Sequence, residues 1–229
     1  MASSRITTSE FIIQPADSSH FHYAEEICRM YIESAKQRGT GIAKRTPEYV
    51  TEKMREGKAI IALHRDGRFA GFSYIETWSH GNYVANSGLI VNPEFRSKGL
   101  GSEIKGAIFN LSRAKYPNAK IFGITTSMPV MKMNSDLGYR PVTFSELTQD
   151  DEFWKGCQSC PNFDILTRNT RKMCLCTGML YDPAQNGSNK FDIRKQMVKF
   201  ERWLRMKHFI LFKKFRSDNP SDDGQLNSK

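Results

Sequence analysis

No apolar run in this chain is long enough to cross a bilayer as a helix. The opening residues Met1-Ala2-Ser3-Ser4-Arg5 contain no apolar stretch ahead of a cleavage site, so the sequence shows no secretory signal. Neither absence reflects a shortage of core-forming residues, since 39% of the chain is apolar and 25% is charged. We therefore expect a folded, cytoplasmic protein without a membrane span.

Two nucleotide-binding patterns are also missing. The chain has no Gly, four residues, then Gly-Lys-Ser or Gly-Lys-Thr, which excludes a P-loop. It also lacks a Gly-x-Gly-x-x-Gly fingerprint after the first strand of a parallel unit, which argues against a dinucleotide-binding fold.

Basic charge is concentrated in one C-terminal segment. Residues 190–216 hold a surplus of eight positive charges, of the ten in the whole chain. We expect a main domain at residues 1–181, a linker at 182–189, a basic amphipathic helix at 190–216 and a disordered tail at 217–229. Apolar side chains recur in the basic helix at steps of three, four or seven: Ile193, Met197, Phe200, Leu204, Leu211 and Phe215. An interfacial or nucleic-acid role is open, but we favour packing on the domain or on a partner subunit. The sequence leaves the oligomeric state open, a homo-oligomer included.

Periodicity predicts strands and helices in a definite order. We expect a strand at 11–14, a helix at 23–36, and a helix to residue 55 that begins with Thr46 as N-cap and Pro47 at its first position. Antiparallel strands follow at 59–63, 69–77 and 83–91, with turns at Asp66-Gly67 and at 80–82. A helix at 102–115, a strand at 120–126, a helix at 130–137 and strands at 140–147 and 173–181 complete the domain.

A glycine-containing loop, Arg96-Ser97-Lys98-Gly99-Leu100-Gly101, lies between a strand and a helix. Backbone N–H groups freed from side-chain obstruction by glycine converge on an anion at the positive end of a helix. Arg96 and Lys98 add positive charge. The loop therefore indicates a ligand that carries a di- or triphosphate, although the loop by itself is also typical of a plain helix start.

This loop and the order of elements resemble the GNAT acetyltransferases over residues 11–181. The family signature has a core of Arg or Gln, two residues, Gly, one residue, then Gly or Ala, and Gly138-Tyr139 resembles its closing Gly-Phe pair. The resemblance implies an α/β (α+β) fold with a mixed, mostly antiparallel sheet flanked by helices. It implies an acyl-coenzyme A dependent N-acyltransferase that uses acetyl-CoA or succinyl-CoA. The pyrophosphate would bind the amides of Arg96, Ser97, Lys98, Gly99, Leu100 and Gly101, and the pantetheine arm would pair with the backbone of Leu89 and Val91.

Acyl transfer to an amine needs a base, for which Glu76 and His80 are candidates. Glu76 lies on a strand that faces the expected cleft, and His80 follows at its end. An exposed strand carboxylate and a turn histidine are the plainer interpretations. Many GNAT enzymes carry a Tyr four residues before the closing Gly, as proton donor to the thiolate. That position here is Asn134, which can hydrogen-bond the sulfur but cannot act as an acid.

The acceptor amine is expected near residues 36–45, where Arg38, Lys44 and Arg45 can hold carboxylates. A solvated basic loop is the alternative. Residues 38–45, 83–91 and 153–157 resemble stand-alone acyltransferases of Bacteroidetes-type bacteria associated with arginine biosynthesis. That likeness implies an amino-acid acceptor, glutamate first. Acylation of proteins or polyamines, and a non-catalytic module that senses acyl-coenzyme A, are the other hypotheses.

Four of the five cysteines lie in a polar insertion at residues 153–176. Cys157-x2-Cys160, thirteen residues, then Cys174-x-Cys176 resembles a structural zinc site with four thiolates. Buried free thiols are an equally good interpretation, because two cysteines two apart on a strand share one face. We expect no structural disulfides in a reducing cytosol.

Overall fold

The computed structural model describes residues 6–7, 10–38 and 45–186. The predicted basic helix, the tail and the last residues of the predicted linker lie outside these residues, as does Lys44. The side chain of Arg38 is likewise not described. In the predicted linker, the structure shows a short helix, α7, at Pro183–Asn186.

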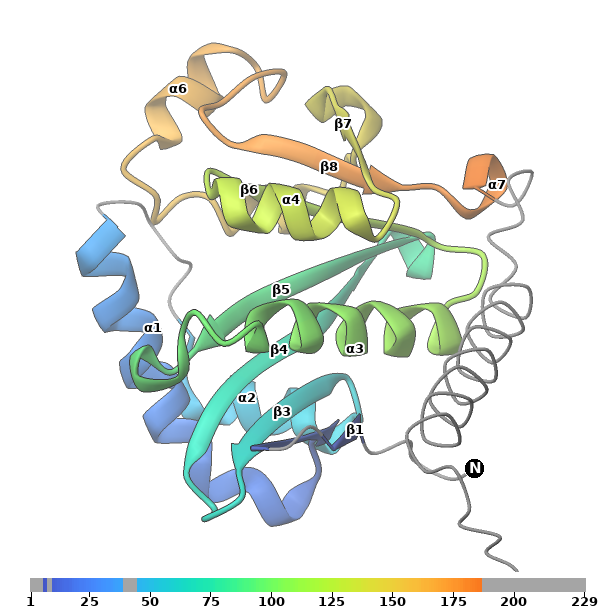
Figure 1. The fold of residues 1–229 in the computed structure, drawn as a ribbon. Helices are drawn as coiled ribbons and strands as arrows, with labels where there is room; N and C mark the ends of the chain where they lie inside the picture. Colours follow the sequence, from blue (N-terminus) through green and yellow to red (C-terminus); the bar gives the residue numbers. More distant parts are fainter. Residues whose placement is uncertain (1–5, 8–9, 39–44, 187–229) are drawn as a thin grey trace, which may run out of the picture. The chain divides into compact units, whose positions relative to one another are not determined.

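Eight strands form a single sheet in the order β1-β2-β3-β4-β5-β6-β8-β7 (Figure 1). All neighbours are antiparallel except β5 and β6, which are parallel. The mixed, mostly antiparallel sheet and flanking helices confirm the predicted fold class. The strands span Ile6–Thr7 (β1), Phe11–Pro15 (β2), Ala59–His64 (β3), Phe69–Trp78 (β4), Tyr83–Val91 (β5), Lys120–Thr125 (β6), Arg140–Val142 (β7) and Thr177–Tyr181 (β8).

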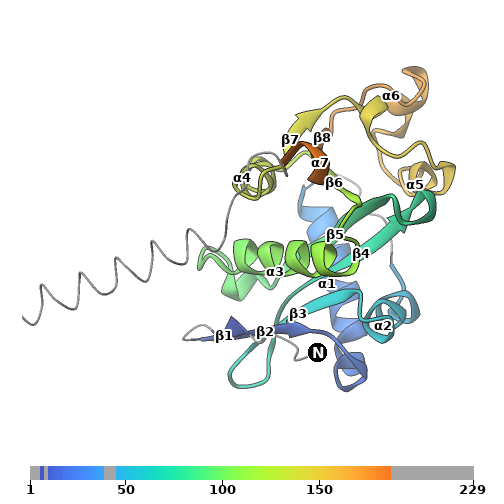
Figure 2. The same cartoon turned by 90° about the vertical axis from the view of Figure 1, so that its right-hand side faces the viewer.

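Helices cover both faces of this sheet. The α-helices span Ala24–Arg38 (α1), Pro47–Arg55 (α2), Leu100–Lys115 (α3), Met128–Asp136 (α4), Asp151–Lys155 (α5), Phe163–Arg168 (α6) and α7. Helices α1 and α2 lie on one face of the sheet and α3 on the other (Figure 2). Apolar residues of α1 and α2 belong to one buried cluster and those of α3 to another. The Thr46 hydroxyl accepts the Tyr49 N–H at 3.3 Å, so the predicted cap of α2 is confirmed.

Two predicted strands are shorter than expected. The strand predicted at 140–147 ends at Val142, because Phe144 and Leu147, three residues apart, turn into the core on a 3-10 turn. The strand predicted at 173–181 begins at Thr177, whose partner Thr125 is the last residue of β6. Residues before Thr177 have no strand edge to pair with. The expectation that Cys174 and Cys176 share one face of a strand is therefore wrong.

The strand β1 was not predicted from the sequence. It contributes only two residues to the edge of the sheet, which is too short for a recognisable pattern. Within the described part of the chain, no helix has both the length and the apolar content needed to traverse a membrane.

Candidate active site

The sheet opens between β5 and β6. Their parallel pairing covers only three residue pairs, from Tyr83 with Lys120 to Ala85 with Phe122. Beyond that point β5 continues to Val91, so its edge from Asn86 onward is not paired with β6. An unpaired strand edge offers N–H and C=O groups to an extended ligand. The predicted pantetheine-binding residues Leu89 and Val91 lie on this edge.

A bulge interrupts β5 beside the opening. Tyr74 pairs with Ser87 and Phe72 with Ile90, so Gly88 and Leu89 together face the single residue Ser73. A bulge of this kind removes backbone N–H and C=O groups from the hydrogen bonds between the strands and turns them in another direction. Gly88 adopts φ +63°. A Cβ there would lie 2.2 Å from Tyr74 Cε1, so both the conformation and the space require glycine.

The loop predicted to bind phosphate, residues 96–101, has five of its six backbone N–H groups available, because the Arg96 N–H donates to the Pro93 carbonyl at 3.3 Å and the prediction for that amide is wrong. Ser97 and Gly99 adopt φ values of +65° and +81°, and Gly99 precedes the first residue of α3. Among the described residues, no acceptor pairs with the backbone N–H groups of 97–101, whereas those of Ser102 and Glu103 bond the Gly99 carbonyl. Five consecutive free amides at a helix N-terminus form an anion-binding nest.

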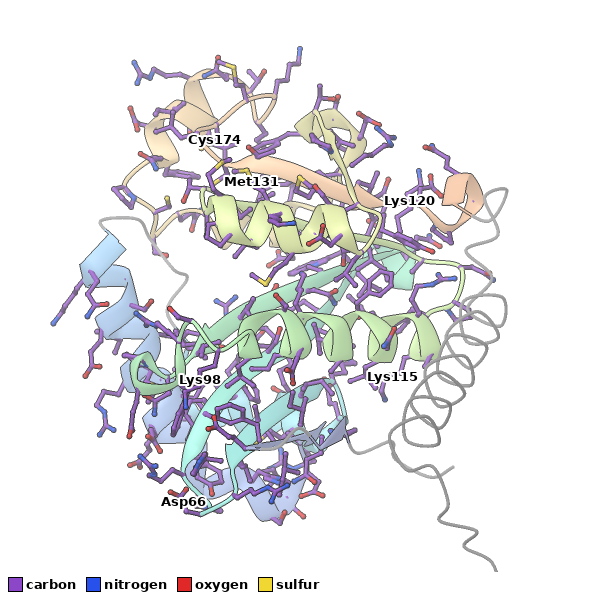
Figure 3. All side chains as sticks on the ribbon, in the orientation of Figure 1. Asp66, Lys98, Lys115, Lys120, Met131 and Cys174 are labelled. Atoms are coloured by element: carbon purple, nitrogen blue, oxygen red, sulfur yellow. The ribbon has the colours of Figure 1, made fainter. Side chains whose placement is uncertain are left out.

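The two cationic side chains of the loop are partly engaged by the protein. Lys98 Nζ lies 2.9 Å from Glu10 Oε2, and Arg96 Nε donates to the Val91 carbonyl at 3.2 Å. Figure 3 shows Lys98 beside the segment that leads into α3. An anion bound at this loop would therefore depend mainly on the backbone amides, with Arg96 and Lys98 as exposed charges around it.

On the opposite face of the sheet, a polar cluster surrounds Glu76. Its Oε1 accepts a hydrogen bond from the Tyr49 hydroxyl at 2.5 Å and lies 3.5 Å from the Arg45 guanidinium. Arg45 also donates through Nε to the Tyr74 hydroxyl at 2.5 Å. The Arg45 and Glu76 side chains are 19% and 13% exposed, so both can be reached from solvent. The pair lies at the level of Ala85, where β5 and β6 separate.

Burial perturbs the phenols of this cluster. It raises the pKa of Tyr49, and the nearby Glu76 carboxylate raises it further. The pKa of Tyr74 is raised by burial first and by Glu76 second. Both phenols are therefore neutral at physiological pH, where the Tyr49 hydroxyl donates to Glu76 and the Tyr74 hydroxyl accepts from Arg45. The Glu76 carboxylate lies beside one guanidinium.

The remaining predicted catalytic residues are placed differently. His80 is exposed in a 3-10 turn that follows the end of β4, four residues after Glu76 in the chain. Asn134 is 1% exposed on α4, and its Oδ1 has no hydrogen-bond partner among the described residues. The structure thus brings Glu76 together with Arg45 but leaves His80 apart.

Sequence reasoning missed Tyr49 and Tyr31. Tyr49 lies on α2 three residues after its cap, and Tyr31 on α1 donates to the Gly88 carbonyl at 2.5 Å. Both tyrosines appear as apolar positions in a helical pattern, and nothing local indicates a polar partner on β4 or β5.

The four clustered cysteines line one cavity of about 20 Å³, although they are up to 19 residues apart in the chain. Burial and the neighbouring thiols raise the pKa of Cys157 to about 11 and that of Cys176 to about 12. The described residues contain no group of three or more cysteine, histidine or acidic side chains arranged to hold a metal ion. Cys174, visible near β8 in Figure 3, packs with Cys157 and Cys176 against an apolar cluster. Zinc binding stays a prediction.

A family model described as the acetyltransferase (GNAT) family matches residues 28–129. A search of curated proteins finds no match.

Solved structures share the fold at low identity. N-acetylglutamate synthase from Neisseria gonorrhoeae, solved with coenzyme A and N-acetyl-glutamate, is 15% identical with a TM-score of 0.54, over 77% of this chain and 36% of that one. This chain thus spans about a third of that synthase. A Mycobacterium tuberculosis protein in complex with CoA is 15% identical with a TM-score of 0.51, over 74% and 98%. Phosphinothricin acetyltransferase from Sinorhizobium meliloti, solved with acetyl-CoA, is 13% identical with a TM-score of 0.50, over 80% and 89%.

Proposed function

We propose that this chain, whose residues 28–129 match the acetyltransferase (GNAT) family model, is an acyl-coenzyme A dependent N-acyltransferase whose acceptor is the amine of an amino acid, with L-glutamate first. The observation that carries the proposal is the Arg45–Glu76 pair on the face opposite α3. An amino acid presents one carboxylate and one ammonium. The pair offers one cation and one anion in a partly buried place, which matches those two groups.

In this proposal the donor binds from the α3 side. The amides of 97–101 hold the coenzyme A pyrophosphate, and the unpaired edge of β5 carries the pantetheine arm. The thioester then lies near the bulge at Gly88 and Leu89, whose displaced backbone can polarise the acyl carbonyl.

The acceptor enters from the α1 and α2 side. Its α-carboxylate replaces Glu76 at the Arg45 guanidinium, and its ammonium meets the Glu76 carboxylate. Glu76 then receives the proton that the ammonium must lose before attack, directly or through a water. Tyr49 holds Glu76 in place through the 2.5 Å hydrogen bond. Arg38 and Lys44 remain proposed contacts for a side-chain carboxylate.

The similarity to an N-acetylglutamate synthase supports this proposal through the fold alone, since the identity is 15%. The donor is acetyl-CoA or succinyl-CoA. The succinyl group carries a carboxylate that the acetyl group lacks, and the basic residues proposed for the acceptor, Arg38, Lys44 and Arg45, can accept it. We also propose a role in arginine biosynthesis and a cytoplasmic location.

Release of free thiol by the full chain tests the acceptor. The donors are acetyl-CoA and succinyl-CoA, and the acceptors are L-glutamate, L-aspartate, L-glutamine, spermidine and a lysine-rich peptide. We expect thiol release with glutamate and an N-acylglutamate product by mass. Release with spermidine or the peptide but not with glutamate overturns the acceptor. No release with any amine favours a module that senses acyl-coenzyme A.

A matched pair of variants tests the role of Arg45. Arg45→Gln should raise the KM for glutamate at least tenfold, because one partly buried charge-assisted contact is lost. Arg65→Gln removes an exposed arginine in the β3–β4 turn and should leave KM unchanged. Equal KM values for the two variants would show that Arg45 does not hold the acceptor.

A further inference from the structure

A buried lysine on α3 has no role in the site as described so far. Lys105 is 3% exposed, and no carboxylate among the described residues pairs with it. Its Nζ lies 5.3 Å from the centre of the Tyr139 ring. Burying an ammonium without an anion is costly, so such a position needs an explanation.

Lys105 lies on the face of α3 that lines the opening. It follows Gly101 by four residues, and residues four apart share one helix face. A Cβ at Gly101 would lie 3.6 Å from the Val91 side chain on β5 and 3.9 Å from Met133 on α4. This face therefore looks toward the unpaired part of β5 and toward α4, between which the coenzyme A arm is proposed to lie.

Buried polar groups connect this position to the point where the strands separate. The Tyr139 hydroxyl donates to Asn86 Oδ1 at 2.9 Å, and Asn86 Nδ2 donates to Ser112 Oγ at 2.7 Å. Asn86 is the first residue of β5 beyond its pairing with β6. The Tyr139 N–H bonds the carbonyl of Asn134, the residue that replaces the usual tyrosine acid. Lys105 and Asn134 thus both adjoin Tyr139.

Burial lowers the pKa of Lys105 from 10.5 to about 8, and desolvation is its only cause. None of the titratable side chains on the elements around it contributes: Glu76, Tyr74, Tyr83, His64, Tyr139, Tyr181 and, two residues earlier on its own helix, Glu103. A pKa near that of a thiol, about 8.5, suits proton transfer to sulfur at neutral pH.

We propose that Lys105 donates the proton to the coenzyme A thiolate as it leaves, the step that Asn134 cannot perform. The proposal rests on the acyl transfer described above. After the amine adds to the carbonyl, the C–S bond breaks and its electron pair stays on sulfur. A proton moves from the Lys105 ammonium to that sulfur. The acceptor ammonium loses two protons during the reaction; one restores Lys105 through solvent, and the other is released.

Steady-state kinetics of Lys105→Met test the step, with whichever amine the parent protein acylates. Methionine is unbranched and of similar volume, and it carries no ionisable proton. We expect kcat at pH 7 to fall about a hundredfold, the lower end of general-acid effects, because a thiol is a good leaving group. The Kd for coenzyme A should change less than threefold. The parent kcat should decline above about pH 8, and this decline should be absent in the variant.

Two further variants make the result decisive. Lys115→Met, on the exposed end of α3, should behave as the parent. Lys105→Arg keeps the charge but gives up no proton, so it should be as slow as Lys105→Met. Parent-like kcat in Lys105→Met or Lys105→Arg would overturn the proposal, as would a loss confined to coenzyme A binding. If the parent acylates another amine but not glutamate, the proposed acceptor is refuted and the comparison of the Lys105 variants still applies. If the parent is inactive with every amine, both the acyl-transfer proposal and the Lys105 proposal are refuted.

Discussion

Replacing Lys105 with methionine should stabilise the protein, even though it slows the reaction. A lysine whose pKa falls from 10.5 to about 8 on folding costs about 3 kcal/mol at pH 7. Methionine carries no charge and fills the same buried space. The free energy of unfolding of Lys105→Met should therefore exceed that of the parent by about 3 kcal/mol, or about 6–12 °C in Tm for a domain of this size.

The pH dependence of that difference has a definite sign. Between pH 8 and 10.5 the unfolded parent holds a proton on Lys105 that the folded parent has lost, so raising the pH stabilises the parent. The difference in the free energy of unfolding between Lys105→Met and the parent should have its full value below about pH 8 and should shrink toward zero as the pH approaches 10.5. Other groups titrate equally in both proteins and cancel in the difference.

Guanidinium unfolding followed by circular dichroism at pH 7 and at pH 10 measures this gap. Lys115→Met serves as control, and its stability should lie within about 0.5 kcal/mol of the parent. Equal stability of Lys105→Met and the parent at pH 7 would show that the ammonium is not desolvated. A gap that stays constant up to pH 10 would show that its cause is packing rather than charge.

Three other changes test separate parts of the structure. Gly88→Ala should cost about 2–5 kcal/mol of stability, because the new Cβ clashes with Tyr74 at positive φ; a thermal melt matching the parent would contradict the bulge. Tyr49→Phe should lower kcat about tenfold while coenzyme A binding stays constant, since Glu76 loses its hydrogen bond; an unchanged kcat would remove Tyr49 from the site. Elemental analysis decides between the two interpretations of the four clustered cysteines: core thiols, which fit the described geometry, leave the parent metal-free, whereas one zinc per chain that is lost in Cys157→Ser would establish a thiolate site.

Local sequence patterns predicted most of the helices, strands and turns, but few of the side-chain contacts between them. The caps, the turn at Asp66-Gly67 and the phosphate loop depend on residues close together in sequence, and each appears where its pattern indicates. Strand ends depend on partners. The strand expected from Met173 begins at Thr177 because β6 offers no further residue to pair with.

The site residues show the same division. Glu76 and Arg45 could be proposed from charge and position, but their pairing with each other and with Tyr49 depends on how α2 packs on β4. Lys105 follows Ile104 in the sequence and would ordinarily be assigned to solvent. Its burial arises from the close approach of α3 to the segment after α4, which no periodicity in one helix reports.

We propose above that the amides of residues 97–101 bind the coenzyme A pyrophosphate. Gly99 and Gly67 provide a matched test, because they adopt φ values of +81° and +90° and a Cβ on either meets nothing within 4 Å. Leucine at either position imposes similar backbone strain, but only at Gly99 would the side chain occupy the anion site.

Isothermal titration of coenzyme A into the parent, Gly99→Leu and Gly67→Leu makes the comparison directly. We predict that Gly99→Leu raises the Kd at least tenfold and that Gly67→Leu leaves it at the parent value. Equal Kd values for all three proteins would contradict the account.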